Sequence, residues 1–481
     1  MRKALKYAFV AAMVALCLLP LASMLCGYQG KNLENRPLAQ EPSLFNGDKL
    51  NTQFPIEFDD YFDDHFGLRE EMVTLINALT EAIFGDTLND KVVIGKDDMY
   101  FYSETMGDYT GTALLSDGEL MRAAKIIKLL SDSAETSGAT FAFTIAPNKN
   151  SIYPEYMPDY ILKATDETNR ERLAGYLREL GVDYIDLYGE LTALKAQADE
   201  KGELIYYVHD THWNMRGAIL FYRDIMDRLG GEYEPYDDSR LSVSYDYSGD
   251  LHCFVSPAAE GQFEDVSYLP AGGYEIADKK NPERDSVFET YNDKNSLSLM
   301  LYRDSFVKVL VPYISSEVGR VRYSTVFPYD FTDIGDGFDA VIIELVERNI
   351  PNLTKHLPTV YANRLEGIGD ITGDVEAYGR CDKKKGRIFG CFDAYDYNPL
   401  TDTLAVMLNC GGRTYVYEAF PMLDSSMEVL AREHFGDAYA QSGFALTLPE
   451  DMTQGEYSFS FILLRSDTAV GSGELGTITI E

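Results

Sequence analysis

The chain has 481 residues, enough for about two to three domains, and its 45% hydrophobic and 12% aromatic content supports well-packed cores. A chain that is disordered throughout is therefore excluded. The formal net charge of −36 argues against nucleic acid as a partner, because a polyanion is bound through basic groups, and against a protein that lies flat on anionic lipid.

The first predicted element is a membrane span. Basic residues near the start precede an uncharged, mostly apolar run over Tyr7–Cys26, and ~20 such residues can cross a bilayer. Because basic flanks stay in the cytoplasm, the rest of the chain is predicted to lie outside it. A cleaved signal peptide, followed by secretion, is the alternative. We favour an anchor over residues 1–27, since no clear cleavage site precedes Tyr28.

Residues 28–90 are predicted to connect this anchor to the main domain. Gln29–Asn51 is polar and contains prolines, which is typical of a linker. Leu68–Ile83 has apolar residues at helical spacing, and this spacing predicts a helix that packs on the main domain.

Residues 91–380 alternate between short apolar runs and segments with helical periodicity. Ser116 is a candidate N-cap for the first of the predicted helices. The alternation predicts a three-layer α/β domain with a mainly parallel sheet. The predicted strands are Phe141–Ala146, Val182–Leu187, Leu204–Val208, Ser298–Tyr302, Val321–Phe327 and Ala340–Leu345, and the predicted helices are Asp117–Ser131, Asn214–Leu229 and Val307–Val318.

Polar residues follow four of these predicted strands. Ligands of open α/β sheets bind beyond the carboxyl ends of the strands, so these residues are expected along one edge. The acidic segment Tyr233–Asn295 has weak periodicity and is interpreted as an insertion that caps the site or binds a substrate. The residues expected at the edge are Asn148, Lys149, Asp210, His212, Ser305, Glu347 and Arg348.

Three of these residues have the side chains of an acyl-transfer triad. A serine hydroxyl is a poor nucleophile at neutral pH and needs a base, which in turn needs a carboxylate to orient it. Ser305 is the candidate nucleophile, His212 the candidate base and Asp210 its candidate partner. The alternative for Ser305 is a helix N-cap, although that position would also point backbone N–H groups towards a developing oxyanion.

Other roles remain open for the neighbouring residues. His209, His212 and Asp210 have a spacing that permits a metal, but no further His or Cys cluster stands nearby, so neither a metal nor another cofactor is predicted. Trp213, the only tryptophan, is interpreted as a core residue or a sugar-stacking platform. Arg348 and Glu347 are candidates for an ion pair at the rim of the pocket.

Residues 381–481 have a different texture, with short strand-like runs separated by turn residues. They predict a β-sandwich-like module. A location outside the cytoplasm permits one disulfide among Cys381, Cys391 and Cys410, and buried free thiols are the alternative. The predicted strands are Leu404–Leu408, Thr414–Tyr417, Tyr457–Leu464 and Thr477–Ile480.

An ordered set of short motifs resembles the SGNH-hydrolase-like family of alginate O-acetylation proteins, the AlgX and AlgJ type, and the related bacterial DHHW proteins. The motifs run in the order of the family over roughly residues 32–350, and the ordered set is more specific than any single motif. They are Glu34–Leu38, Asp64–Arg69, Val93–Asp97, Ala146–Lys149, Ile152–Glu155, Asp210–Trp213 and Asp304–Phe306.

The resemblance implies an exported domain with a Ser-His-Asp triad, which falls on Ser305, His212 and Asp210. It further implies transfer of acetyl groups to hydroxyls of an exopolysaccharide or another cell-envelope glycan, with a membrane-bound acyltransferase as the supplier. The β-rich tail has the position of a carbohydrate-binding module found in some members. The further binding or oxyanion candidates are Asn148, Lys149, Trp213 and Arg348.

Two positions depart from the pattern of the family. Thr211 replaces a histidine of the DHHW motif, and Arg303 stands where a glycine commonly precedes the aspartate and serine. An arginine there can remove a close backbone approach and alter the oxyanion hole. The alternatives to a membrane-anchored O-acetyltransferase are therefore a carbohydrate esterase with the same triad and a non-catalytic glycan-binding or assembly protein.

Overall fold

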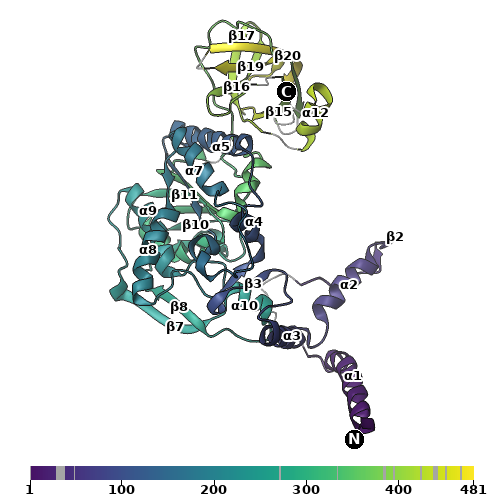
Figure 1. Cartoon of the computed structure of the whole chain (residues 1–481). Coiled ribbons are helices and arrows are strands. Elements are labelled where there is room, and N and C mark those ends of the chain that lie inside the picture. Colours follow the sequence, from purple (N-terminus) through teal and green to yellow (C-terminus); the bar gives the residue numbers. More distant parts are fainter. Residues whose placement is uncertain are drawn as a thin grey trace.

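The computed structural model describes residues 2–28, 38–47, 49–269, 272–332, 334–382, 386–393, 396–422, 425–436, 442–449, 452–465 and 468–480. A central α/β domain carries a β-rich module at one end and separate helices of the N-terminal part at the other (Figure 1). Most of the Glu34–Leu38 motif and part of the predicted linker lie outside the described residues.

A seven-stranded sheet forms the centre of the main domain, in the order β6-β5-β13-β11-β12-β10-β9. The strands from β6 to β12 run parallel to one another, whereas β10 and β9 add an antiparallel edge. The predicted mainly parallel sheet is confirmed. The strands are β5 (Thr140–Ala146), β6 (Tyr184–Ile185), β9 (Glu275–Ile276), β10 (Val287–Tyr291), β11 (Ser298–Tyr302), β12 (Arg320–Ser324) and β13 (Ala340–Val346).

Helices cover both faces of this sheet. α5 (Asp117–Thr136) and α7 (Asn169–Glu179) contribute to one buried core, and α8 (Leu187–Lys201), α9 (Met215–Leu229) and α11 (Val311–Glu317) contribute to the other. Successive residues of β13 alternate between the two cores, as expected for a strand buried on both faces. The domain therefore has the three predicted layers.

The helix predicted from Asp117 begins where its N-cap was expected. The Ser116 hydroxyl accepts from the Glu119 backbone N–H, and the Glu119 carboxylate accepts from the Ser116 backbone N–H, which is a complete capping box. This reciprocal pair gives a partner to the backbone N–H groups of Ser116 and Glu119, which have none within the helix.

The predicted strand Leu204–Val208 is absent from the sheet. This segment is a loop between α8 and α9, with a single bridge between Tyr206 and Trp213. Its apolar residues are buried because the loop packs into the core, where the Tyr206 hydroxyl donates to the Pro147 carbonyl. A short buried apolar run has the same composition in a loop as in a strand, so the pattern was misleading here.

The single helix predicted over Val307–Val318 is divided in two. A 3₁₀ turn covers Ser305–Leu310, and α11 begins after it with Pro312 in its first turn. Proline lacks a backbone N–H and is compatible with a helix start, so a new helix begins there rather than continuing the turn.

The C-terminal module contains two antiparallel sheets around one shared core, in agreement with the predicted sandwich. Its first strand, β14, crosses the predicted domain boundary at residues 380 and 381. Cys391 and Cys410 have free thiols, so they form no bridge with each other or with Cys381. The elements are β14 (Ala377–Asp382), β15 (Arg387–Phe392), β16 (Asp402–Cys410), β17 (Arg413–Ala419), α12 (Ser425–Phe435), β18 (Gly443–Thr447), β19 (Gly455–Arg465) and β20 (Thr468–Ile480).

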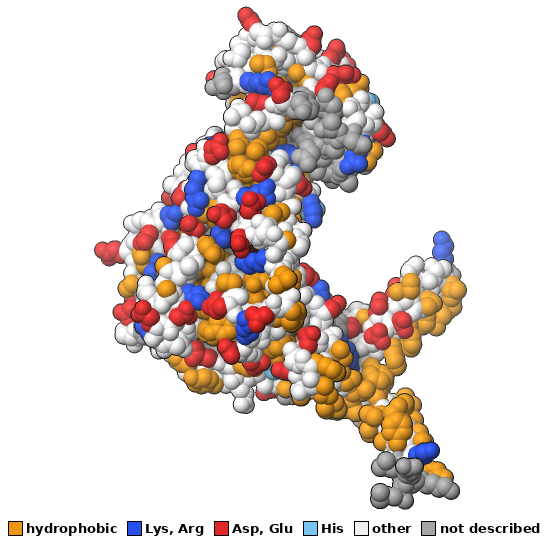
Figure 2. Space-filling view, in the orientation of Figure 1, with side chains coloured by type: hydrophobic (Ala, Val, Ile, Leu, Met, Phe, Trp, Pro, Cys, Tyr) orange, Lys and Arg blue, Asp and Glu red, His pale blue; other side chains and the backbone are white. Residues whose placement is uncertain are grey.

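The N-terminal part begins with α1 (Arg2–Leu25), in which Lys6–Leu25 has a mean hydropathy of 2.4 and is long enough to cross a membrane. α2 (Phe54–His65) and α3 (Arg69–Phe84) follow it, and apolar side chains gather over these helices (Figure 2). The remaining elements are β1 (Phe45–Asn46), β2 (Lys49–Leu50), β3 (Val92–Ile94), β4 (Tyr100–Tyr102), α4 (Met106–Thr110), α6 (Lys149–Ile152), β7 (Leu241–Tyr247), α10 (Asp250–Val255) and β8 (Phe263–Tyr268).

Candidate active site

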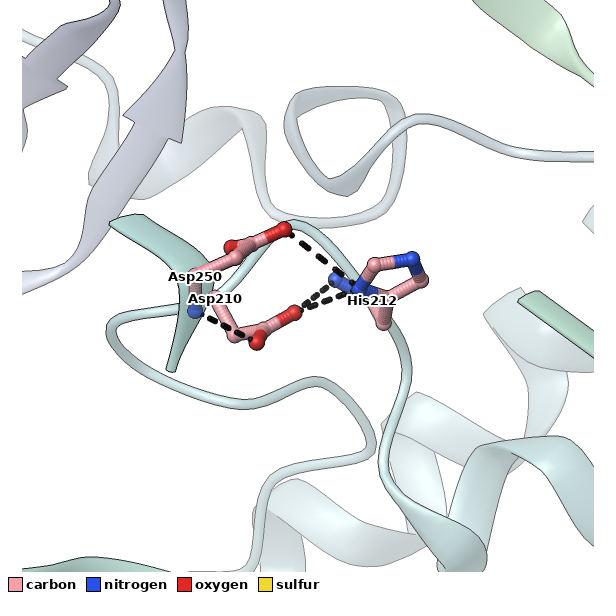
Figure 3. A group of neighbouring side chains, drawn as sticks. All are labelled: Asp210, His212 and Asp250. Atoms are coloured by element: carbon pink, nitrogen blue, oxygen red, sulfur yellow. Dashed lines mark hydrogen bonds and ion pairs between the residues drawn. The ribbon is translucent and has the colours of Figure 1, made fainter. Parts of the chain in front are cut away.

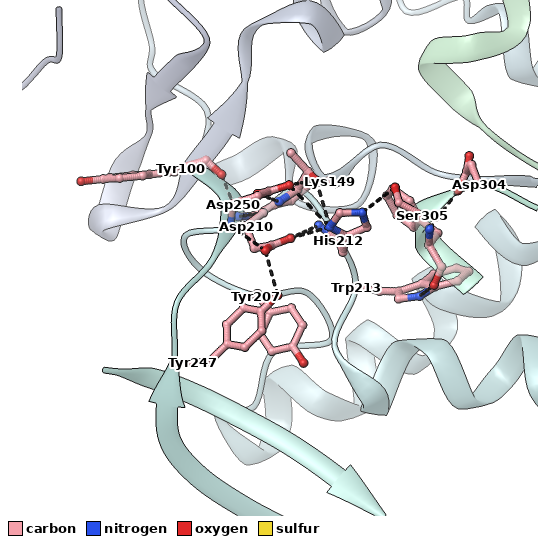
Figure 4. Close-up of polar contacts among 12 residues, drawn as sticks. Tyr100, Lys149, Tyr207, Asp210, His212, Trp213, Tyr247, Asp250, Asp304 and Ser305 are labelled. Carbon is pink, nitrogen blue, oxygen red and sulfur yellow. Dashed lines mark hydrogen bonds and ion pairs between the residues drawn. The ribbon is translucent and has the colours of Figure 1, made fainter. Parts of the chain in front are cut away.

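The structure brings Ser305, His212 and Asp210 together. The His212 ring lies between the other two side chains, with Nδ1 at 2.6 Å from Asp210 Oδ1 and Nε2 at 2.7 Å from Ser305 Oγ (Figure 4). Asp210 is buried, His212 is partly buried and Ser305 is exposed. An imidazole held in this way can donate one proton to the carboxylate and accept another from the hydroxyl.

Two neighbouring residues fix the loop that carries this imidazole. Asn214 caps α9, because its side-chain oxygen accepts from the Arg216 backbone N–H at 3.0 Å. The Trp213 indole N–H donates to the Phe306 carbonyl at 2.9 Å, which joins the loop to the turn that starts at Ser305. These contacts place the base and the hydroxyl on segments that pack directly against each other.

Ser305 follows the carboxyl end of β11 and is held by the preceding residue. Asp304 accepts from the backbone N–H of Phe306 at 2.9 Å and from that of Val346 at 2.6 Å. The side chain thus connects the start of the 3₁₀ turn to the end of β13. The sequence reasoning did not assign this role to Asp304.

The Asp210 carboxylate is saturated with donors. Its Oδ1 accepts from the His212 backbone N–H as well as from the ring, and its Oδ2 accepts from the Tyr247 hydroxyl and the Asp250 backbone N–H, each at 2.8 Å (Figure 4). Tyr247 and Asp250 come from the inserted segment Tyr233–Asn295. They were not predicted individually, although the acidic composition of that segment indicated a contribution to the site.

The charges around Asp210 and His212 shift the pKa of both side chains. Burial alone would lower the pKa of His212, but the adjacent Asp210 carboxylate outweighs burial and raises it above the ordinary value. Burial alone would raise the pKa of Asp210, yet the imidazole and the backbone N–H donors lower it. The carboxylate is therefore ionised at neutral pH, and the imidazole is a stronger base than a free histidine.

Asp210, His212 and Asp250 also have the composition of a metal-binding cluster, and their ligand atoms lie within 4.8 Å of one another (Figure 3). The His212 Nδ1 proton already lies between the two carboxylates, at 2.6 Å from Asp210 and 3.6 Å from Asp250. The Asp250 carboxylate also accepts from the Thr211 hydroxyl. An N–H on Nδ1, as the triad requires, is within reach of both carboxylates.

Three of the predicted binding or oxyanion residues are buried. Lys149 is buried, and its ammonium donates to the carbonyls of Tyr100, Val208 and Asp210 at 2.6–3.0 Å. Trp213 is 1% exposed, which rules out the sugar-stacking alternative in favour of the core. Asn148 is equally buried. The prediction for Lys149 and Trp213 is corrected from direct contact to support of the site, whereas the role of Asn148, whose Oδ1 has no partner within the described residues, stays a prediction.

Arg348 remains close to the reacting groups. Its guanidinium carbon lies 5.7 Å from the centre of the Phe306 ring and 5.7 Å from that of Tyr102. The predicted ion pair with Glu347 is wrong, because Glu347 pairs instead with Arg170 at 3.2 Å. His209 stacks on the Tyr100 ring and has a structural role.

The residues of this site lie in a part of the chain that matches a known domain family. Residues 92–308 match the family described as SGNH hydrolase-like domain, acetyltransferase AlgX. This part of the chain is similar to an SGNH hydrolase-like domain of the AlgX type. The prediction of the family and of an enzyme of this kind is therefore confirmed. A comparison with curated protein sequences found no match.

Solved structures with a related arrangement have low sequence identity. A DHHW family protein from Eubacterium siraeum has 14% identity and a TM-score of 0.38, over 50% of this chain and 90% of its own. Bacillus cereus PatB1 has 15% identity and a TM-score of 0.41, over 54% and 96%. The O-acetyltransferase domain of Pseudomonas putida AlgJ has 18% identity and a TM-score of 0.37, over 54% and 92%.

Proposed function

We propose that the chain is an extracytoplasmic O-acetyltransferase that moves an acetyl group to a glycan through an acyl-enzyme on Ser305. In the first step, Ser305 Oγ attacks the carbonyl carbon of the donor while His212 Nε2 takes its proton. The donor alcohol then leaves with that proton. In the second step, His212 removes a proton from a sugar hydroxyl, the sugar oxygen attacks the acyl carbon, and Ser305 recovers its proton.

One observation carries the proposal. A single imidazole is hydrogen-bonded both to an ionised, buried carboxylate and to an exposed hydroxyl, inside a domain of the AlgX type. The alternative of Ser305 as a helix N-cap is wrong, because Asp304 caps the turn and Ser305 is its first residue, with its hydroxyl in contact with His212. Arg348, which lies over the Phe306 ring beside the imidazole, is the remaining candidate for contact with the substrate or its oxyanion.

We also propose that α1 stays in the membrane as an anchor and that a membrane-bound acyltransferase supplies the acetyl group. Exposed apolar side chains on α2 and α3 support a position of these helices at the membrane surface, beside α1 (Figure 2). They are Ile56, Phe58, Phe62, Leu75, Ile76, Leu79, Ile83 and Phe84.

The test is acetylation of the protein by an activated acetyl ester, followed by intact mass spectrometry and by the burst of released alcohol. The wild type is expected to gain the mass of one acetyl group, and Ser305→Ala is expected to gain none. Ser242→Ala, at an exposed position on β7, is the matched control and should behave as the wild type. An unchanged burst in Ser305→Ala would refute the proposed nucleophile.

The acceptor distinguishes the transferase from the esterase with the same triad. A transferase should release its acetyl group faster when an oligosaccharide is added and should produce the acetylated sugar. If the acetyl group passes only to water at every sugar concentration, the protein is an esterase. Sugar binding without any acetylation of Ser305 would identify the non-catalytic alternative.

A further inference from the structure

A cavity of about 460 Å³ lies beside Ser305. Its size is within the ~300–1,000 Å³ range of small-molecule pockets. Ser305 and Arg303 enter its wall from the end of β11, Glu344 from β13, and Tyr329 from the loop after β12. Ser305, the candidate nucleophile, thus both contacts His212 and lines this cavity.

Three polar side chains of the wall are buried and incompletely satisfied. Arg303 is 8% exposed, Tyr329 is 6% exposed and Glu344 is 1% exposed. Within the described residues, Nε of Arg303, the hydroxyl of Tyr329 and Oε1 of Glu344 have no hydrogen-bond partner. Native proteins rarely leave such groups without partners, so three around one cavity indicate a ligand that supplies them.

Besides Glu344, the charged residues of the wall are three cations and three anions: Arg284, Arg303, Lys308, Glu283, Asp285 and Asp304. Asp304 is fixed by two backbone N–H groups and lies beside the Arg303 cation, whose guanidinium donates to the Asp304 carbonyl. Burial, with the Asp304 charge as a second cause, raises the pKa of Glu344 well above its usual range. The shift favours the protonated acid, and the Glu344 carboxyl is hydrogen-bonded to the Asp304 side chain.

The ligand should therefore offer hydroxyls, which both donate and accept, without a net charge. Arg303 and Tyr329 can donate and the unpartnered Oε1 of Glu344 can accept, while Phe327, Val326 and Leu345 give the same cavity an apolar side. A sugar ring has both properties, because its hydroxyls lie around the edge and its C–H groups form a face. The net charge of −36 further disfavours a polyanionic chain.

We propose that this cavity, named here the acceptor pocket, binds a neutral sugar ring of the acceptor glycan and presents one of its hydroxyls to the acetyl group on Ser305. Arg303 and Tyr329 donate hydrogen bonds to other oxygens of the same ring, and Glu344 Oε1 accepts one from a ring hydroxyl. This inference rests on the proposed function and adds the class of acceptor and the residues that select it.

Tyr329→Phe is the decisive variant, because it removes one unpartnered hydroxyl and keeps the ring. The probe is methyl α-D-glucopyranoside, added to enzyme acetylated by an activated ester. The KM for the probe is expected to rise about tenfold, the factor for one lost hydrogen bond, while the burst and the thermal stability are unchanged. Glu344→Gln, whose amide oxygen can still accept, should retain most of the affinity.

Tyr397→Phe is the matched control, since it also removes a buried hydroxyl without a partner, but in the C-terminal module. It should leave the KM unchanged. A KM in Tyr329→Phe within twofold of the wild type would overturn the acceptor pocket, as would a selective loss of the burst, which would assign the cavity to the donor. A lower KM for an equivalent uronic acid glycoside would overturn the proposal that the sugar ring is neutral.

Saturation-transfer NMR with the same probe separates the two proposals, because it needs no acetylation. Probe binding that Tyr329→Phe weakens, in a protein whose wild type shows no burst, supports the pocket and refutes the proposed function. A normal burst with probe binding that is equal in Tyr329→Phe and the wild type refutes the pocket and leaves the proposed function in place.

Discussion

At the scale of single residues, the buried carboxylate controls both the orientation and the basicity of His212. Asp210→Asn would keep the size of the side chain but remove its charge. Because that charge raises the pKa of His212, the pKa should fall and the acidic limb of the rate profile should move to lower pH. The rate should also fall by about 10³–10⁴-fold, since an amide can favour the wrong tautomer.

The measurement is the pH dependence of the burst rate with an activated acetyl ester. The neutral imidazole is the active form, so the wild-type rate should fall as the pH drops through a value above the ordinary 6.5 of histidine. A profile of Asp210→Asn with the same acidic limb as the wild type would contradict this role of the carboxylate.

Asp250 should contribute charge without orienting the ring. Its carboxylate lies 3.6 Å from His212 Nδ1, whereas that of Asp210 lies at 2.6 Å. Asp250→Asn should therefore also shift the acidic limb to lower pH, but with a loss of rate at least about tenfold smaller than in Asp210→Asn. Asp246→Asn removes an exposed charge from the same segment and should change neither quantity.

Residue types and their order were sufficient to predict that Ser305, His212 and Asp210 come together. Asp250 and Tyr247 were not predictable individually, because only the fold of the insertion brings them to Asp210. Lys149 was misassigned for a related reason. A lysine after a strand has the same sequence signature whether it faces a ligand or donates to three backbone carbonyls.

At the scale of elements, the start of α9 holds the catalytic loop in place. The Asn214 side chain accepts from two backbone N–H groups of the first turn and donates to the Leu204 carbonyl. Asn214→Ala should lower the free energy of unfolding by about 1–2 kcal/mol and also reduce the burst rate, because His212 precedes the cap. Thermal denaturation and burst kinetics measure the two effects.

Ser116→Ala removes the N-cap of α5, on the opposite face of the sheet, and is the control for this prediction. It should cost a similar free energy of unfolding without a change in the burst rate of the folded protein. Equal burst rates in the two variants would show that the α9 cap contributes to stability alone.

The close approach of α10 to the catalytic loop is also testable. A Cβ at Gly249 would lie 2.1 Å from the His209 carbonyl oxygen and 2.9 Å from the Asp210 Cβ. Gly249→Ala should therefore displace Asp250 and lower the burst rate together with the stability. Gly175→Ala, on α7 with open space around the added atom, should leave the burst rate unchanged and preserve or raise the melting temperature.

Strong local patterns accounted for most of the fold, and tertiary packing accounted for the exceptions. β11 begins and ends at the predicted residues, because a short apolar strand between polar turns is unambiguous there. Leu204–Val208 has a similar composition, but its backbone groups find partners in the loop and in Tyr153 rather than in a sheet. Such competition between local pattern and long-range contacts is decided only in the folded chain.

At the scale of the whole molecule, the apolar faces of α2 and α3 continue the apolar surface of α1 (Figure 2). Leu79 and Ile83 are 53% and 69% exposed, which is costly in water and favourable at a bilayer. Gly67, between α2 and α3, packs so closely on α1 that an added Cβ would lie 2.4 Å from the Pro20 carbonyl oxygen. The three helices thus present one continuous surface.

The full chain in nanodiscs should therefore place α3 at the lipid headgroups. A fluorophore attached at Leu79→Cys or Ile83→Cys, in a background without the native cysteines, should be quenched by nitroxide lipids, whereas one at Ser242→Cys on β7 should not. Protein recovered from membranes should also retain α1 and resist extraction by alkaline carbonate, because a span of ~20 apolar residues inserts stably. Release of an intact chain that begins after Gly27, with equal quenching at all three positions, would instead identify a secreted protein.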